Sequence, residues 1–155
     1  MMLTEIHGDL FAVSNDYYLA HCISADYRLG AGIARQFSIN YDVRRKLFRK
    51  FPHLDDPFSG NHKSYVGKAL LIDNIFNLVT KSRYFEKPTY DTLKHTLEDM
   101  KQQCDKYGIK RLAMPRIGCG LDRLNWDMVK KIIKEIFTDT DIEIVVYYLS
   151  KQEGE

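Results

Sequence analysis

Short apolar runs alternate with amphipathic helical patterns along most of this sequence, and this alternation restricts the fold more than any other feature. Six runs are compatible with β-strands and are separated by turn signals or helical patterns: residues 3–6, 18–24, 68–72, 75–80, 111–114 and 142–149. This order is typical of an α/β domain with a largely parallel sheet and helices on both faces. Ligands of such domains bind at the carboxyl ends of the strands, so we expect a site in the loops that follow them.

Two helices are predicted from the spacing of apolar residues. In the first, successive members of the apolar stripe are 4, 3, 4 and 3 residues apart and so share one face: Leu93, Leu97, Met100, Cys104 and Tyr107. Thr89 is the expected N-cap of this helix, and Gly108 is its expected stop. The second helix starts near Asn125 or Asp127 and leads into the last strand, with the stripe Val129, Ile132, Ile133, Ile136 and Phe137.

Length and composition favour a single globular domain and argue against a membrane protein. The 155 residues are 45% hydrophobic and 28% charged, without repeats or linkers, so we expect one domain over 1–155 with a polar tail from about residue 150. The longest apolar run, 144–149, has six residues, whereas a membrane span needs about 18. The first residues show neither a basic flank nor an apolar signal core, which favours a cytoplasmic location.

Charge and cysteine content give little support to a nucleic-acid partner or a metal site. A formal net charge of +2 is too small to indicate nucleic-acid binding by itself. One basic cluster on a predicted helix is either a solvated face or a guide for a polyanion: Arg44, Arg45, Lys46, Arg49 and Lys50. The three cysteines lie far apart and form no C-x-x-C pair, so we expect reduced thiols and no metal.

Two glycine pairs mark the loops that follow two of the predicted strands. Gly30-Ala31-Gly32 follows the strand at 18–24, and Gly118-Cys119-Gly120 follows the strand at 111–114. Glycine permits positive φ and a close approach of backbone N–H groups to an anion, so two such loops can clamp a diphosphate. A single pair more often forms only a tight turn, and that alternative stays open. Arg35 replaces the third glycine of a Rossmann fingerprint, and Gly67-Lys68 lacks the earlier glycine of a P-loop.

Three charged residues at or beyond the ends of predicted strands have both a functional and a structural interpretation. Asp9 can accept a hydrogen bond from an adenine amine or simply form a turn, and the spacing alone favours the turn. Asp122 can act as a general acid or base or cap the next helix, and the cap is again favoured. Lys81 ends an apolar strand, where a lysine usually only solvates an edge; as a nucleophile it must first lose its proton.

Three further features carry less functional weight. His21 and Cys22 are neighbours in a predicted strand, so their side chains point to opposite faces, which argues against a Cys/His nucleophile pair. Trp126 is expected in the core. The segment 51–66 contains two prolines and two histidines and is predicted to be an irregular excursion without a recognisable motif.

Taken in order along the chain, a set of motifs resembles those of a macrodomain: His7-Gly8-Asp9-Leu10-Phe11, Ala20-His21-Cys22-Ile23-Ser24, Leu29-Gly30-Ala31-Gly32-Ile33-Ala34, Thr80-Lys81, Lys87-Pro88-Thr89-Tyr90 and Met114-Pro115-Arg116-Ile117-Gly118-Cys119-Gly120-Leu121-Asp122-Arg123-Leu124. More narrowly, they resemble the terminal ADP-ribose protein glycohydrolase subclass and the related bacterial antitoxins that remove ADP-ribose from DNA bases. The resemblance covers nearly the whole chain. It implies a three-layer α/β/α sandwich around a six-stranded mixed sheet, with an ADP-ribose cleft across the strand ends.

The resemblance also implies which residues contact ADP-ribose. It places adenine near Asp9 and near Tyr147 or Leu149, and it places the phosphates and riboses at the two glycine loops. The complete set of implied ligand-binding residues is Asp9, Leu10, His21, Ser24, Gly30, Ala31, Gly32, Ile33, Pro115, Ile117, Gly118, Cys119, Gly120, Leu121, Tyr147 and Leu149.

In this subclass a lysine attacks the anomeric carbon of the distal ribose, and an aspartate helps to form and resolve the covalent ADP-ribosyl-lysine. These roles map onto Lys81 and Asp122 and require neither metal nor cofactor. The resemblance implies an ADP-ribosyl hydrolase, expected to be a monomer, that removes terminal mono-ADP-ribose from acidic protein side chains, O-acetyl-ADP-ribose or DNA bases. The alternatives are a module that binds ADP-ribose without cleaving it and a nucleic-acid-binding domain that uses the basic cluster.

Overall fold

A computed structural model of the chain describes residues 1–53 and 65–149. Most of the predicted excursion at 51–66 and the polar tail from residue 150 lie outside the described residues. Within the described ranges, no helix is long and apolar enough to cross a membrane.

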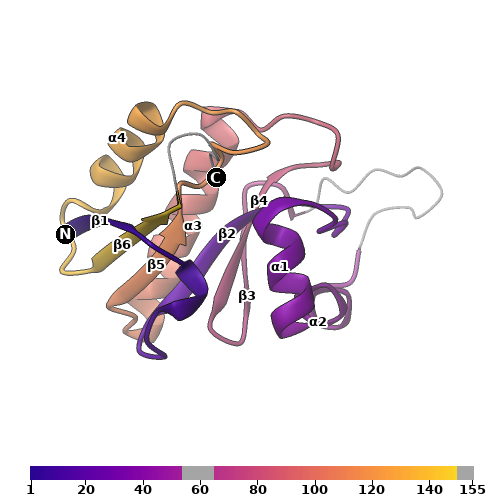
Figure 1. Cartoon of the computed structure of the whole chain (residues 1–155), viewed down its shortest axis with the longest axis horizontal. Coiled ribbons are helices and arrows are strands. Elements are labelled where there is room, and N and C mark those ends of the chain that lie inside the picture. The colour runs from indigo at the N-terminus through magenta and orange to yellow at the C-terminus, as the bar shows by residue number, and fades with distance from the viewer. Residues whose placement is uncertain (54–64, 150–155) are drawn as a thin grey trace.

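A six-stranded sheet forms the centre of the described structure (Figure 1). Its strands, in chain order, are β1 (Met2–His7), β2 (Tyr18–Ser24), β3 (Ala69–Ile72), β4 (Ile75–Lys81), β5 (Arg111–Pro115) and β6 (Glu143–Tyr148). In space the order is β1-β6-β5-β2-β4-β3, and every neighbouring pair is parallel except β3 and β4. Asp73, with φ of 52°, and Asn74 make the tight connection of that antiparallel pair. The prediction of a mixed, largely parallel sheet is therefore confirmed.

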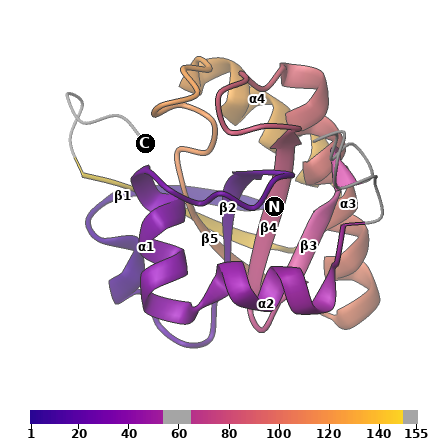
Figure 2. The same ribbon diagram turned by 90° about the vertical axis from the view of Figure 1, so that its right-hand side faces the viewer.

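Helices cover both faces of the sheet, which completes the predicted three layers (Figure 2). The short helix η1 (Leu10–Ala12), α1 (Gly32–Tyr41) and α2 (Val43–Lys50) pack on one face, whereas α3 (Tyr90–Tyr107) and α4 (Trp126–Phe137) pack on the other. Strand residues alternate between the layers, as their period of two requires. On β2, Ala20 contributes to the α3 and α4 side, while Leu19 and Ile23 contribute to the α1 side.

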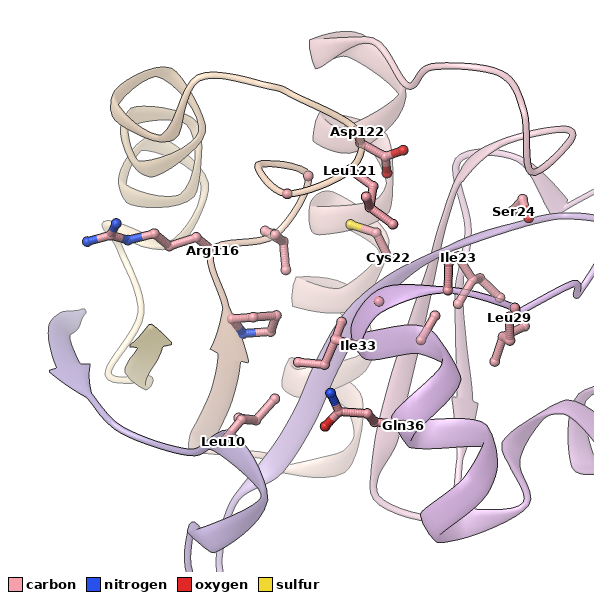
Figure 3. A pocket seen from close by; sticks show the side chains of 18 of the residues that line it. Leu10, Cys22, Ile23, Ser24, Leu29, Ile33, Gln36, Arg116, Leu121 and Asp122 are labelled. Carbon is pink, nitrogen blue, oxygen red and sulfur yellow. The ribbon is translucent and has the colours of Figure 1, made fainter. Parts of the chain in front are cut away.

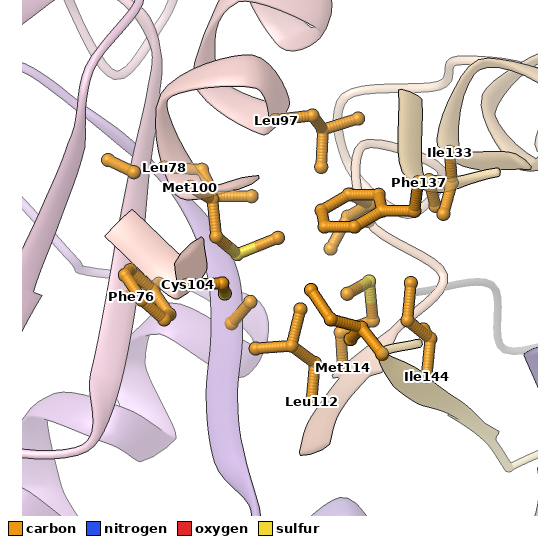
Figure 4. Packing of buried hydrophobic residues seen from close by; sticks show 14 of the residues in the cluster. Phe76, Leu78, Leu97, Met100, Cys104, Leu112, Met114, Ile133, Phe137 and Ile144 are labelled. Carbon is orange, nitrogen blue, oxygen red and sulfur yellow. The ribbon is translucent and has the colours of Figure 1, made fainter. Parts of the chain in front are cut away.

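The two predicted helices have the predicted caps. Thr89 accepts a hydrogen bond from the backbone N–H of Thr92, and Gly108 ends α3 with φ of 68°. Of the two candidates for the start of α4, Asn125 is the N-cap, because its side chain accepts from the N–H of Met128 at 3.2 Å. Most residues of the apolar stripes are buried over the sheet (Figure 4). Ile132 and Ile136 of α4 are only partly buried, and Tyr107 is exposed at the last turn of α3.

Candidate active site

The carboxyl ends of the parallel strands meet at one edge of the sheet and enclose a cavity of about 520 Å³ (Figure 3). Because β1 and β6 lie at one side of the sheet and β4 lies near the other, the cavity crosses the ends of five strands. Gly8 and Asp9 line it after β1, Tyr147 and Leu149 line it from β6, and Lys81 lines it from β4. Since β5 and β2 are neighbours in between, their glycine loops lie side by side.

Nearly all predicted site residues line this single cavity: Asp9, Leu10, Ser24, Gly30, Ala31, Gly32, Ile33, Lys81, Pro115, Ile117, Gly118, Gly120, Leu121, Asp122, Tyr147 and Leu149. The cavity lining does not include His21 or Cys119. The predicted set of site residues left out the following lining residues, most of which stand within the quoted motifs: Gly8, Phe11, Cys22, Ile23, Arg28, Leu29, Ala34, Gln36, Tyr84, Lys87 and Arg116. Most of them are chain neighbours of predicted residues, but Gln36, one turn into α1, and Tyr84 gave no sequence signal.

Both glycine loops adopt the conformation for which glycine is suited. Gly32 opens α1 with φ of 61°, and Gly118 has φ of 73°. Ala31, the N-cap of α1, gives no side-chain hydrogen bond, so the first N–H groups of this helix are available to an anion in the cavity. A Cβ atom on Gly32 would lie 3.4 Å from Leu121 Cδ1, which shows that the loops approach each other across the cavity. Their arrangement fits a diphosphate between them.

Lys81 and Asp122 form an ion pair at the β4 end of the cavity. The Lys81 Nζ donates to Asp122 Oδ1 at 2.6 Å, and their side chains are only 12% and 16% exposed. The structural alternatives for both residues are therefore wrong: Lys81 does not solvate a strand edge, and Asn125, not Asp122, caps α4. Nearby, Lys87 donates to the carbonyl oxygen of Leu121 at 2.8 Å and so ties the second glycine loop to the segment after β4.

Asp26 connects the segment after β2 to the segment after β4. Its Oδ1 accepts hydrogen bonds from Ser24 Oγ at 2.6 Å and from the Arg28 N–H at 3.0 Å. Its Oδ2 accepts from the Tyr84 N–H at 2.8 Å, and its own N–H donates to the Ser82 carbonyl at 3.1 Å. One carboxylate thereby fixes the first glycine loop relative to the strand end that carries Lys81.

Asp9 has the turn role that the sequence favoured, and it also lines the cavity. Its Oδ1 accepts from the Phe11 N–H at 3.0 Å, which caps η1, and the residue also lines the cavity. The capping bond fixes the carboxylate at the β1 end of the cavity, far across the sheet from Lys81.

The cysteines of the site are poor nucleophiles. Burial, reinforced by the nearby Asp122 carboxylate, raises the pKa of the Cys22 thiol well above its usual range. Burial likewise raises the pKa of Cys119 to about 12, against a smaller opposing effect of Arg116. Both thiols are therefore protonated at neutral pH, and the amine of Lys81 is the better candidate nucleophile.

His21 lies beneath the cavity, on the opposite face of β2 from Cys22, as the strand period predicts. It is fully buried, and its ring stacks on Phe37 with centroids 4.0 Å apart. Asn77 donates through Nδ2 to the carbonyls of Leu70 and Ile75, so its Oδ1 faces His21 Nε2 at 2.5 Å. This places the proton on Nε2 and makes His21 a core residue that supports the strand.

We expect the His21 imidazole to remain neutral down to about pH 4. Burial lowers its pKa from 6.5 to about 4, against the smaller opposing effect of the hydrogen bond with Asn77. Since the folded state favours the neutral ring, this contribution to stability is complete above pH 6.5 and is lost as the pH falls toward 4. NMR titration of the His21 imidazole signals measures this pKa, and a midpoint near pH 6.5 would contradict the buried position.

The basic cluster on α2 is engaged in local contacts. Arg45 pairs with Asp42, Lys46 pairs with Asp73, and Lys50 donates to the Leu71 carbonyl. Arg44 donates through Nε to the Tyr27 carbonyl at 2.8 Å and so supports the loop after β2. These contacts favour a structural role over a polyanion guide. In residues 1–53 and 65–149, no group of three or more His, Cys, Asp or Glu side chains is placed to hold a metal ion.

Comparisons with known proteins agree with this geometry. A family model described as Macro domain matches residues 60–133. Human ADP-ribose glycohydrolase OARD1 is 45% identical over 149 residues, which are 95% of this chain and 91% of the human protein. The bovine protein of the same name matches to the same extent.

Solved structures show the same fold. The macrodomain of Mycobacterium tuberculosis DarG matches with a TM-score of 0.78 and 23% identity, covering 96% of this chain and 99% of that chain. The Thermosipho africanus DarTG structure in complex with ADP-ribose matches with a TM-score of 0.71 and 19% identity, covering 94% and 41% respectively. Together with the high identity over nearly the full length of the OARD1 proteins, these matches show that the chain belongs to the macrodomain family.

Proposed function

We propose that this protein is an ADP-ribosyl hydrolase that binds ADP-ribose in the cavity and releases it from a macromolecular acceptor. The observation that carries this proposal is the ion pair of Lys81 and Asp122, 2.6 Å apart and mostly buried beside two glycine loops. The name of the OARD1 relatives, ADP-ribose glycohydrolase, and the ADP-ribose complex of the DarTG structure support it.

The order of the cavity residues suggests how ADP-ribose lies across the sheet. Adenine fits at the β1 and β6 end, where Asp9 is held by its capping bond and Tyr147 adds an aromatic surface. The diphosphate fits between the glycine loops, at the N-terminus of α1. The distal ribose then reaches the β4 end, where its anomeric carbon faces the amine of Lys81.

The ion pair of Lys81 and Asp122 supplies the nucleophile and the proton acceptor for the two steps of a covalent mechanism. The Lys81 ammonium first transfers one proton along its hydrogen bond to Asp122 Oδ1, which leaves an electron pair on Nζ. This pair forms a bond to the anomeric carbon while the bond to the acceptor breaks and its electrons leave with the acceptor. Water then attacks the same carbon, the C–N bond breaks, and its electron pair returns to Nζ. Asp122 gives its proton back to Nζ, and the proton that the water loses goes to the departed acceptor. Free ADP-ribose is released and the ion pair is restored.

The same chemistry applies to a modified acidic side chain and to a modified DNA base, because in both the acceptor is attached at the anomeric carbon. The leaving group is a carboxylate in a glutamate or aspartate ester, and it is a ring nitrogen in a modified DNA base. Because a carboxylate is the better leaving group, esters are expected to react without further assistance.

We expect the wild-type protein to release ADP-ribose from glutamate-ADP-ribosylated protein and from thymidine-ADP-ribosylated single-stranded DNA. Chromatographic measurement of free ADP-ribose checks this result. Binding of free ADP-ribose in calorimetry without product release from either substrate would contradict the proposal and would favour a module that only binds ADP-ribose.

A further inference from the structure

The cavity extends past Lys81 to side chains that the proposed mechanism does not use. Arg28, Tyr84 and Lys87 line the cavity together with Lys81 and Asp122. Tyr84 is 51% exposed, and its chain neighbour Phe85, which is not among the lining residues, is 63% exposed. Their ring centroids are 5.4 Å apart and the rings are nearly perpendicular, at 89°. Exposed aromatic rings at a cavity that holds a partly buried ion pair favour a contact with something outside the chain.

The position of Tyr84 is fixed by a backbone hydrogen bond and a cation–π contact. The guanidinium of Arg28 lies 4.5 Å from the centroid of the Tyr84 ring, in a cation–π contact. The backbone N–H groups of both residues donate to the single carboxylate of Asp26, at 3.0 and 2.8 Å. Arg28 comes from the segment after β2 and Tyr84 from the segment after β4, so Asp26 joins the two residues that stack. We call Arg28, Tyr84 and Phe85 the stacking platform.

The charges around the stacking platform suit an anionic backbone. Three carboxylates of the neighbouring segments are already engaged: Asp26 by backbone amides, Asp122 by Lys81, and Glu86 by the Arg83 N–H at 2.7 Å. The exposed cations of Arg28 and Lys87 therefore have no free carboxylate among these three to pair with. Lys87 uses one of its three donors for the Leu121 carbonyl.

We propose that the stacking platform is an acceptor subsite that binds the unmodified nucleobase next to the ADP-ribosylated base of single-stranded DNA. This inference rests on the proposed function, which puts the ADP-ribosylated base at Lys81 and its unmodified neighbour at Tyr84. Aromatic rings interleaved with cations bind single-stranded nucleic acids through base stacking and phosphate contacts. An acidic peptide would pair with the cations, but its carboxylates would not stack on the two exposed rings.

Kinetics with matched oligonucleotides tests this subsite. The substrates are a thymidine-ADP-ribosylated single-stranded oligonucleotide with intact neighbouring bases and the same oligonucleotide with abasic neighbours. Because stacking on one aromatic side chain is lost, Tyr84→Ala is expected to raise KM for the intact oligonucleotide about tenfold, with a much smaller effect on kcat. Tyr84→Phe, which keeps the ring, should restore KM. On the abasic oligonucleotide, wild type and Tyr84→Ala should have similar KM values.

Tyr107→Ala is the matched control, because Tyr107 is 57% exposed at the end of α3 and is absent from the cavity lining. This variant should behave as wild type on both oligonucleotides. Equal KM increases for Tyr84→Ala on intact and abasic oligonucleotides, or the same increase on glutamate-ADP-ribosylated protein, would overturn the proposal. The second result would indicate that the platform binds a peptide.

A separate binding measurement distinguishes failure of this subsite from failure of the proposed function. If wild type releases ADP-ribose from neither substrate, the hydrolase proposal fails. Fluorescence anisotropy with an unmodified single-stranded oligonucleotide still tests the platform in that case. Weaker binding by Tyr84→Ala than by Tyr84→Phe supports stacking, and equal binding by these two variants overturns it.

Discussion

Lys81→Ala is expected to lower kcat by at least about a thousandfold, because the proposed reaction then lacks its nucleophile. The dissociation constant for ADP-ribose should change far less, since the adenine and diphosphate contacts come from other elements of the cavity. Single-turnover release of ADP-ribose measures the loss of turnover, and calorimetry measures the dissociation constant for ADP-ribose. In wild type, mass spectrometry of protein quenched during turnover should detect one ADP-ribosyl group on the peptide that contains Lys81.

A second lysine in the same kind of pair provides the control. Lys101 donates to Asp139 at 2.9 Å, on the helical face away from the cavity, so Lys101→Ala removes an ion pair without touching the site. The turnover of Lys101→Ala should equal that of wild type. Undiminished turnover by Lys81→Ala would contradict the covalent mechanism.

Asp122→Ala should lower kcat by about a hundredfold or more, because the proton acceptor is lost while the amine remains.

The strand and helix pattern predicted the architecture well because it depends on local periodicity. The caps at Thr89 and Gly108, the alternating faces of β2 and the strand ends all follow from side-chain chemistry within a few residues. Placement of the two glycine loops required the strand order, which local pattern does not contain. The resemblance to macrodomains placed both loops at one ADP-ribose cleft without giving the strand order, and the adjacency of β5 and β2 agrees with that placement.

Residues whose surroundings depend on long-range packing could not be placed from local pattern alone. For Asp122 local spacing favoured a helix cap, whereas the resemblance to macrodomains gave it a role beside Lys81. The cap is Asn125, and the Asp122 carboxylate pairs with Lys81 at the end of β4. His21 belongs to a motif near the cavity, but the strand pleat turns its ring into the core against Phe37. Asp26 and Tyr84 had no signal, because they are 58 residues apart and meet only through the pairing of β2 with β4.

Gly118→Ala is expected to weaken ADP-ribose binding by about tenfold or more and to destabilise the protein. Its φ of 73° is costly for a residue with a Cβ, by roughly 1–2 kcal/mol. The new Cβ would also lie 2.9 Å from Leu124 Cδ1, so Leu124 must move. Leu124 donates its N–H to the Gly118 carbonyl at 2.7 Å, and this bond shapes the second glycine loop. Displacing it should misalign the N–H groups proposed to hold the diphosphate.

Gly108→Ala separates backbone strain from the function of the loop. Gly108 has nearly the same φ, 68°, but a Cβ at this position would meet no other atom within 4 Å, and the residue ends α3 away from the cavity. Both variants should therefore lose unfolding free energy from backbone strain, and Gly118→Ala should lose more because its Cβ also displaces Leu124; urea denaturation measures both losses. Only Gly118→Ala should bind ADP-ribose more weakly in calorimetry. If both variants retain wild-type affinity, the second glycine loop does not hold the diphosphate, because its shape is then irrelevant to the ligand.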